Sequence, residues 1–102
     1  MKSWLLALAF LFLPLQAQAQ LVSVDKNYRI TRVDYAENRI EVQYLNGKTV
    51  TLFVDIDGNT QVLLRRRPLY WKRLQKGWIV QVKGGLEFGG HIKGKTIIVH
   101  ST

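Results

Sequence analysis

The 102-residue chain contains no cysteine, and this absence excludes several kinds of chemistry. Without cysteine there is no disulfide framework, no thiolate metal site, no cysteine nucleophile and no cysteine-linked lipid anchor. The chain also lacks internal repeats and low-complexity tracts, and it is too short for two ordinary domains. The sequence therefore predicts a single domain that depends on a compact sheet or on a partner for its stability.

Histidine is scarce as well, and the titratable residues form no catalytic pattern. His91 lies in a glycine-rich stretch, and neither it nor His100 adjoins a nucleophile motif. Asp55 and Asp57 lie in a cluster of turn residues, where their side chains would project apart. We therefore expect no enzymatic activity, no metal site and no cofactor.

The first residues have the organisation of a secretory signal peptide. A short basic start is followed by an apolar run from Trp4 to Leu15, and then by Ala17-Gln18-Ala19, an A-x-A cleavage pattern. The run is shorter than the roughly 20 apolar residues that a membrane-spanning helix needs. The sequence predicts a signal peptide at 1–19 and a mature domain at 20–102. We expect a periplasmic or secreted protein with no transmembrane segment after cleavage.

Strand patterns dominate the remainder of the chain. Between Arg39 and Leu45 the apolar residues Ile40, Val42 and Tyr44 alternate with polar ones, which predicts a half-buried strand. Asn46-Gly47 follows, a strong signal for a two-residue hairpin turn. Further strands are expected at 28–33, 49–54, 61–64, 78–83 and 95–100, with a glycine-rich loop at 84–90.

The first of these strands contains an irregularity in its apolar pattern. Tyr28 and Ile30 have one parity, and Val33 has the other. A β-bulge inserts one residue and so reverses the side to which later side chains point. We therefore expect a bulge or a strong bend between Ile30 and Val33.

One segment has a helical pattern. Pro68 suits the first turn of a helix, where its missing N–H is not needed, and Gly77 suits the position after the last turn. Tyr70, Trp71 and Leu74 would then share an apolar face. The sequence predicts one short helix near residues 68–76.

This order of elements favours a small, mainly β fold. Bent strands with a helix between the third and fourth are typical of a five-stranded OB-like barrel, and an SH3-like barrel is the alternative. The segments Ile30–Asp34, Asn46-Gly47 and Leu74–Gly84 resemble the strand and turn grammar of small exported bacterial OB-like domains of uncharacterised function. That resemblance implies a barrel without catalytic activity.

The charge of the chain is unevenly distributed. The whole sequence has a formal charge of +8. Residues 20–64 hold five basic and six acidic side chains, whereas residues 65–102 hold nine basic side chains and only one acidic one, Glu87. Such asymmetry indicates an interaction surface for acidic partners. A basic surface that only keeps the protein soluble is the simpler interpretation.

The candidate binding residues follow from this asymmetry. Basic grooves with stacking aromatic side chains bind single strands with little sequence preference. We expect an anionic ligand or polymer, such as nucleic acid, glycan or lipid phosphate. The alternative is a structural subunit of a bacterial envelope assembly, which would dock an acidic protein partner or pair through a strand edge at 95–100. Tyr44, Trp71 and Trp78 are expected in the core. The candidate cations are Arg65, Arg66, Arg67, Lys72, Arg73 and Lys76, and the candidate stacking residues are Tyr35, Phe53 and Phe88.

The signal-peptide prediction has a direct test. The exported protein should begin at Gln20, because cleavage is expected after Ala19. Intact-mass measurement of the exported product checks this, and a mass that includes residues 1–19 would contradict it.

Overall fold

The computed structural model describes residues 22–102, so the predicted signal peptide lies outside the described residues. The described part is mainly β, as the sequence predicts. Two short 3-10 turns, η1 and η2, are the only helical elements in this part of the chain. The strands are β1 (Val22–Asp34), β2 (Arg39–Tyr44), β3 (Thr51–Asp55), β4 (Gln61–Leu64), β5 (Arg67–Pro68), β6 (Ile79–Glu87) and β7 (His91–Ser101), with η1 at Trp71–Arg73 and η2 at Phe88–Gly90.

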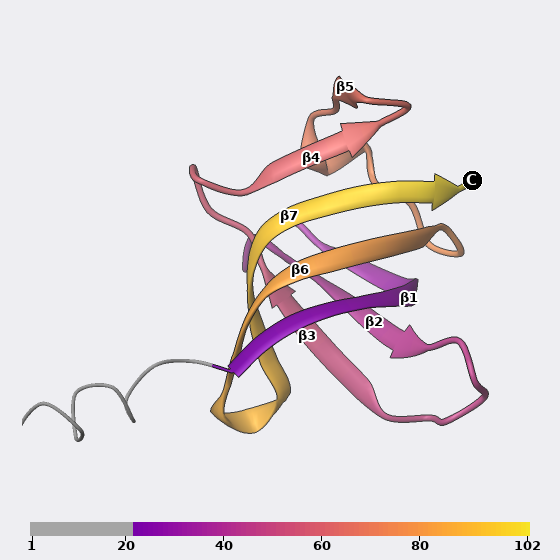
Figure 1. Cartoon of the computed structure of the whole chain (residues 1–102), viewed down its shortest axis with the longest axis vertical. Coiled ribbons are helices and arrows are strands. Elements are labelled where there is room, and N and C mark those ends of the chain that lie inside the picture. The colour runs from indigo at the N-terminus through magenta and orange to yellow at the C-terminus, as the bar shows by residue number, and fades with distance from the viewer. Residues whose placement is uncertain (1–21) are drawn as a thin grey trace, which may run out of the picture.

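Five of the strands pair in a closed ring (Figure 1). β1 pairs with β2 on one side and with β6 on the other, both antiparallel. β2 continues antiparallel to β3, and β6 pairs antiparallel with β7. The ring closes because β3 and β7 run parallel to each other. β4 then extends along the second half of β7, and β5 pairs with β4.

The apolar alternation of the sequence places the core inside this ring. Ile40 and Val42 are completely buried, while Arg39 and Glu41, which alternate with them, stay partly exposed. The irregularity in β1 is also confirmed. The register against β2 shifts between Ile30 and Arg32, as expected for a bulge there. The other buried hydrophobic residues are Tyr28, Ile30, Leu52, Val54, Ile56, Val62, Leu74, Val80, Val82, Ile92, Ile97 and Val99.

A pair of glycines allows β6 and β7 to cross closely. Gly84 lies opposite Gly94, next to a register shift between the two strands. A Cβ atom at Gly84 would overlap the backbone carbonyl of Lys93, and one at Gly94 would lie 3.0 Å from the Asp55 carbonyl. Real side chains rarely tolerate such contacts with backbone atoms, so these positions require glycine.

The glycine crossing is the point at which β7 changes its parallel neighbour. Its residues His91–Lys93 pair with β3, and Thr96–Val99 pair with β4. The hydroxyl of Thr60 donates to the Gly94 carbonyl at 2.6 Å, so the segment leading into β4 is fixed at the crossing. One long bent strand therefore supports both the ring and the β4–β5 hairpin.

The predicted helix near residues 68–76 is wrong. Pro68 is paired in β5, Tyr70 has an extended backbone with ψ of 125°, and only η1 is helical here. The physical reason is length, because a helix of two turns is marginal without strong packing. Instead, the Leu69 N–H donates to the Val62 carbonyl at 2.8 Å and continues the β4–β5 hairpin.

Several element boundaries also differ from the sequence prediction, and the last strand begins at His91 rather than at residue 95. The first strand begins at Val22 rather than Tyr28, because β6 offers a partner along that length. The β2–β3 connection spans residues 45–50 rather than the two residues Asn46-Gly47. Residues 84–87 continue β6 instead of forming a loop, since their glycines allow the strand to bend.

The glycine crossing generates a stability prediction. Gly84→Ala should lower the free energy of unfolding by about 1–3 kcal/mol, because the new methyl group meets a backbone carbonyl that cannot move without disrupting the sheet. Gly58→Ala is the matched control, since nothing lies within 4 Å of its Cβ position. Urea unfolding of both variants measures the difference, and equal stabilities would contradict the account of the crossing.

Candidate functional site

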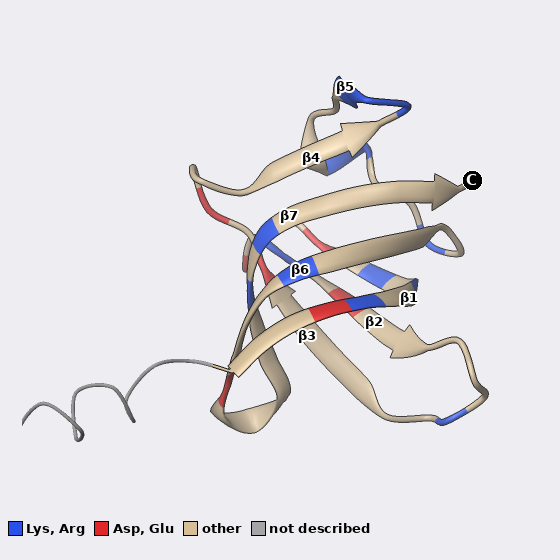
Figure 2. Ribbon diagram, viewed as in Figure 1, with Lys and Arg blue, Asp and Glu red and all other residues tan. Residues whose placement is uncertain are grey.

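Three consecutive arginines form the tip of the hairpin between β4 and β5. Leu64 pairs with Arg67, which leaves Arg65 and Arg66 as a two-residue turn. Their φ angles are 53° and 67°, in the left-handed region that asparagine and glycine normally occupy in such turns. All three arginines are exposed, and the turn is the basic tip seen at the top of Figure 2.

The chain then returns to the ring through a segment with a single buried side chain. Leu74 is 1% exposed and belongs to the hydrophobic core. At the end of the segment, the Gly77 N–H donates to the Ile30 carbonyl at 2.7 Å. We call residues 61–77 the arm. Parallel pairing of β4 with β7 holds its start, and Leu74 and Gly77 hold its end.

Three adjoining hollows lie along the arm where it meets the ring. The first two share Leu64 and Leu69, and the second and third share Tyr35, Leu74 and Gln75. We call this surface the basic groove. Its basic lining residues are Arg65, Arg67, Lys72, Arg73, Lys76 and Arg32.

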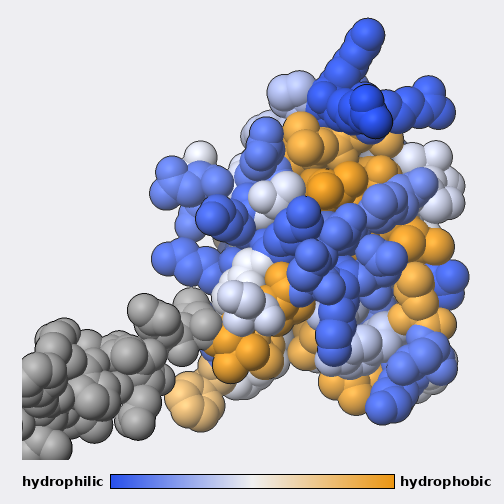
Figure 3. Space-filling model, viewed as in Figure 1, coloured by the Kyte–Doolittle hydropathy of each residue, from blue (hydrophilic) through white to orange (hydrophobic). Residues whose placement is uncertain are grey.

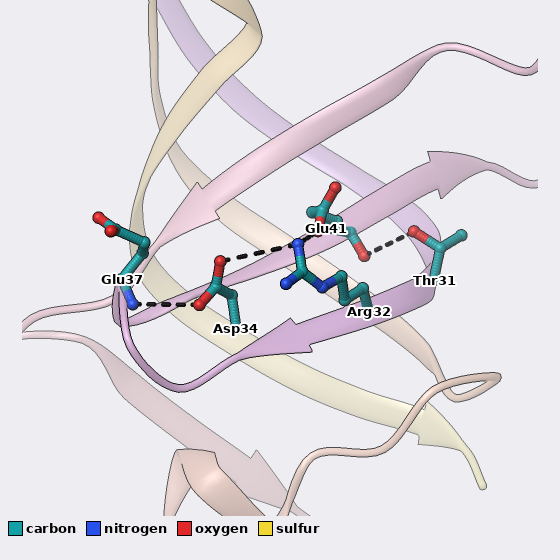
Figure 4. Close-up of polar contacts among 5 residues, drawn as sticks. All are labelled: Thr31, Arg32, Asp34, Glu37 and Glu41. Carbon is teal, nitrogen blue, oxygen red and sulfur yellow. Dashed lines mark hydrogen bonds and ion pairs between the residues drawn. The ribbon is translucent and has the colours of Figure 1, made fainter.

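The groove has no acidic residue in its lining. Among residues 22–102, no ion pair involves any of the six predicted cations. Arg32 differs from them, because its Nη1 lies 3.0 Å from Glu41 and 3.8 Å from Asp34 (Figure 4). The uncompensated charge of the groove therefore comes from the arm rather than from β1.

Aromatic rings lie beside these cations. Tyr35, from the β1–β2 turn, packs against Trp71 with ring centroids 6.0 Å apart and planes inclined by 34°. The Lys72 Nζ lies 5.9 Å from the centre of the Trp71 ring. Trp78 lines the same groove. Tyr35 is 53% exposed, so its ring is accessible to a ligand, as the sequence predicts.

The sequence did not predict where the two tryptophans near the groove lie: Trp78 lines the groove, and Trp71 packs against Tyr35 beside it. Trp71 and Trp78 were expected in the core, and both do pack against it, but neither is fully buried. Tyr70, which the predicted helix would bury, is 62% exposed. The helical pattern could not predict these positions, because only Trp71–Arg73 is helical here and a turn follows at residues 76–77.

The other two candidate stacking residues lie away from the arm. The Phe53 ring is stacked on His91 at 5.0 Å, and the Arg39 guanidinium lies 5.0 Å from its centre. His91 also forms a 3.1 Å contact with Asp55. Phe88 is fully exposed in η2. Tyr35 alone of the three joins the cations.

The predicted strand edge at 95–100 is not free. Residues Thr96–Val99 pair with β4 on one side, and the same stretch pairs with β6 on the other. Docking of a partner strand at this position is therefore excluded in the folded chain. The space-filling view instead shows strongly hydrophilic side chains projecting at the β5 end, beyond an apolar surface (Figure 3).

Comparisons of the chain with protein-family models, with curated proteins and with solved structures found no match. The resemblance to exported OB-like domains thus remains a prediction. Within residues 22–102, no helix has the length and apolar character needed to cross a membrane.

The attachment of the arm can be tested through Leu74. Leu74→Ala should lower the free energy of unfolding by about 2–5 kcal/mol, because it opens a cavity beneath the arm. Leu86→Ala, at a position that is 37% exposed, should cost well under half as much. Chemical denaturation compares the two, and equal losses would show that Leu74 does not anchor the arm.

Proposed function

We propose that the chain is an exported, non-enzymatic binding module of the OB-like barrel class, whose basic groove binds an anionic polymer. The strand order supports the class. In the ring, β1, β2 and β3 pair antiparallel in sequence. The last strand, β7, lies between β6 and β3 and runs parallel to β3, and OB barrels have this order. The arm takes the place of the helix that often connects the third and fourth barrel strands.

The main support for binding is the composition of the basic groove. Its arm contributes five lining cations without any carboxylate among the lining residues. Guanidinium groups bind phosphate, sulfate or carboxylate through paired hydrogen bonds, and lysine adds point charges. Tyr35 and Trp71 offer ring faces on which a base or a sugar can stack. Nucleic acids and anionic glycans offer both an anionic group and a ring that can stack, whereas a lipid phosphate offers the anionic group alone.

The backbone of the turn gives independent support. A left-handed conformation costs an ordinary residue about 1–2 kcal/mol, and here two successive arginines adopt it. Strain of this kind is common at functional sites, where the side chain is worth more than the lost stability. Arginine at both positions is therefore better explained by binding than by folding.

A variant with an unstrained turn can test whether the two arginines lower folding stability and raise binding affinity. The double variant Arg65→Asn/Arg66→Gly installs the preferred residues of the turn. We expect its free energy of unfolding to rise by about 1–2 kcal/mol. We also expect earlier elution from heparin and single-stranded DNA columns. The slope of log affinity against log salt should become shallower by about one for each lost contact.

A charge-matched control separates the groove from net charge. Arg29→Gln/Lys48→Gln removes two exposed cations that belong neither to the arm nor to the groove lining, whereas Arg65 lines the groove and Arg66 lies beside it in the turn of the arm. It should elute close to the parent. An equal loss of retention in the control, or unchanged retention in the turn variant, would contradict the proposed groove and favour the envelope-subunit alternative.

A further inference from the structure

A second, separate cleft lies on the outer surface where β6 and β7 bend. Its volume is 690 Å³, within the range of small-molecule sites. It shares no lining residue with the basic groove. Its lining includes the glycines of the crossing, three lysines from β6 and β7, and polar residues from β1 and the β3–β4 connection: Gly84, Gly85, Gly94, Lys83, Lys93, Lys95, Asp25, Asp57 and Asn59.

The glycine crossing explains why the lysines gather here. Lys83 pairs with Thr96 and Gly84 with Gly94, so Lys95 is an extra residue on β7. Such a bulge re-aims side chains and leaves the ladder locally unpaired. Gly94 is buried, whereas the three lysines are exposed. The lining therefore places three lysines beside Gly84 and Gly85, whose backbone is partly exposed.

The lysines and the carboxylates of the cleft differ in their partners. Among the described residues, none of its three lysines forms an ion pair. Its two carboxylates already accept hydrogen bonds: Asp25 from the Gln81 side chain at 2.7 Å, and Asp57 from the Asn59 N–H at 2.8 Å. These bonds hold the carboxylates in place, and each retains lone pairs for further donors. The lining thus combines lysines, which attract an anion, with carboxylates, which accept hydrogen bonds, and Asp25 lies directly opposite Lys83 in the β1–β6 ladder.

This combination defines a class of ligand. Lysine binds a phosphate group as a point charge and imposes little orientation, so three lysines suit a compact dianion. Carboxylate and amide oxygens suit hydroxyl donors and would repel a second anionic group. We propose that the cleft binds a sugar phosphate, with its phosphate on Lys83, Lys93 and Lys95 and its hydroxyls toward Asp25, Asp57 and Asn59. The site does not depend on the polymer proposed for the basic groove.

The glycines provide a readout for this site. In a titration of the 15N-labelled mature protein, glucose 6-phosphate should shift the amide signals of Gly84, Gly85 and Gly94 saturably. Inorganic phosphate should shift them with an affinity at least threefold weaker, because it lacks hydroxyls for the acidic part of the lining. Glucose should leave them unchanged.

Two variants test the assigned roles. Lys83→Gln/Lys93→Gln/Lys95→Gln should weaken glucose 6-phosphate binding at least tenfold, and its dispersed spectrum reports whether it is folded. Asp57→Asn keeps the side-chain oxygen that accepts from Asn59 but removes the charge. It should weaken glucose 6-phosphate and leave inorganic phosphate binding equal or stronger.

A matched control uses the other site. Arg65→Asn/Arg66→Gly should bind glucose 6-phosphate as the parent does, so failure of the polymer site and failure of the cleft are distinguishable. The sugar-phosphate proposal is overturned if no saturable glycine shift occurs, if phosphate and glucose 6-phosphate bind equally well, or if the triple lysine variant keeps the parent affinity.

Discussion

The close contact between Gly84 and Gly94 is the constraint on which the other features of the structure depend. Because neither residue has a side chain, β6 and β7 can bend together at this point. The bend lets the first part of β7 pair with β3 and the later part with β4. The first pairing closes the ring around the core, and the second carries the hairpin with the three arginines. The bulge beside the crossing also places Lys95 outside the regular ladder, so both candidate binding surfaces follow from one backbone feature.

The basic groove combines a rigid support with a strained tip. Parallel pairing with β7 fixes the start of the arm, and Leu74 fixes its end in the core. Between these two points the chain forms only the β4–β5 hairpin and η1, and no carboxylate lines the groove beside its cations. Tyr35, from a distant turn, supplies the aromatic neighbour of Trp71. A ligand that contacts the arm would therefore also contact the ring, which couples charge recognition to stacking.

Local patterns in the sequence predicted some of this structure and could not predict the rest. Alternation in β2 identified Ile40 and Val42, and the change of parity in β1 located its bulge. The predicted helix near residues 68–76 was wrong because so short a helix is marginal, and the chain pairs Pro68 in β5 and buries only Leu74 instead. The six cations could be grouped from sequence, since they are close neighbours in the chain. The Tyr35–Trp71 contact and the lysine cleft depend on long-range pairing and on a bulge, for which composition carries no signal.

The central claim is that an anionic polymer binds along the basic groove and contacts Trp71 and Trp78. The mature chain holds only two tryptophans, Trp71 and Trp78, because the third lies in the predicted signal peptide. The most direct measurement is therefore a 15N spectrum of the mature protein titrated with a heparin oligosaccharide at low salt. The account predicts shifts of both indole N–H signals and of amides in residues 64–76, which reverse as salt is added. Shifts confined to other surfaces, with both indole signals unmoved, would contradict it.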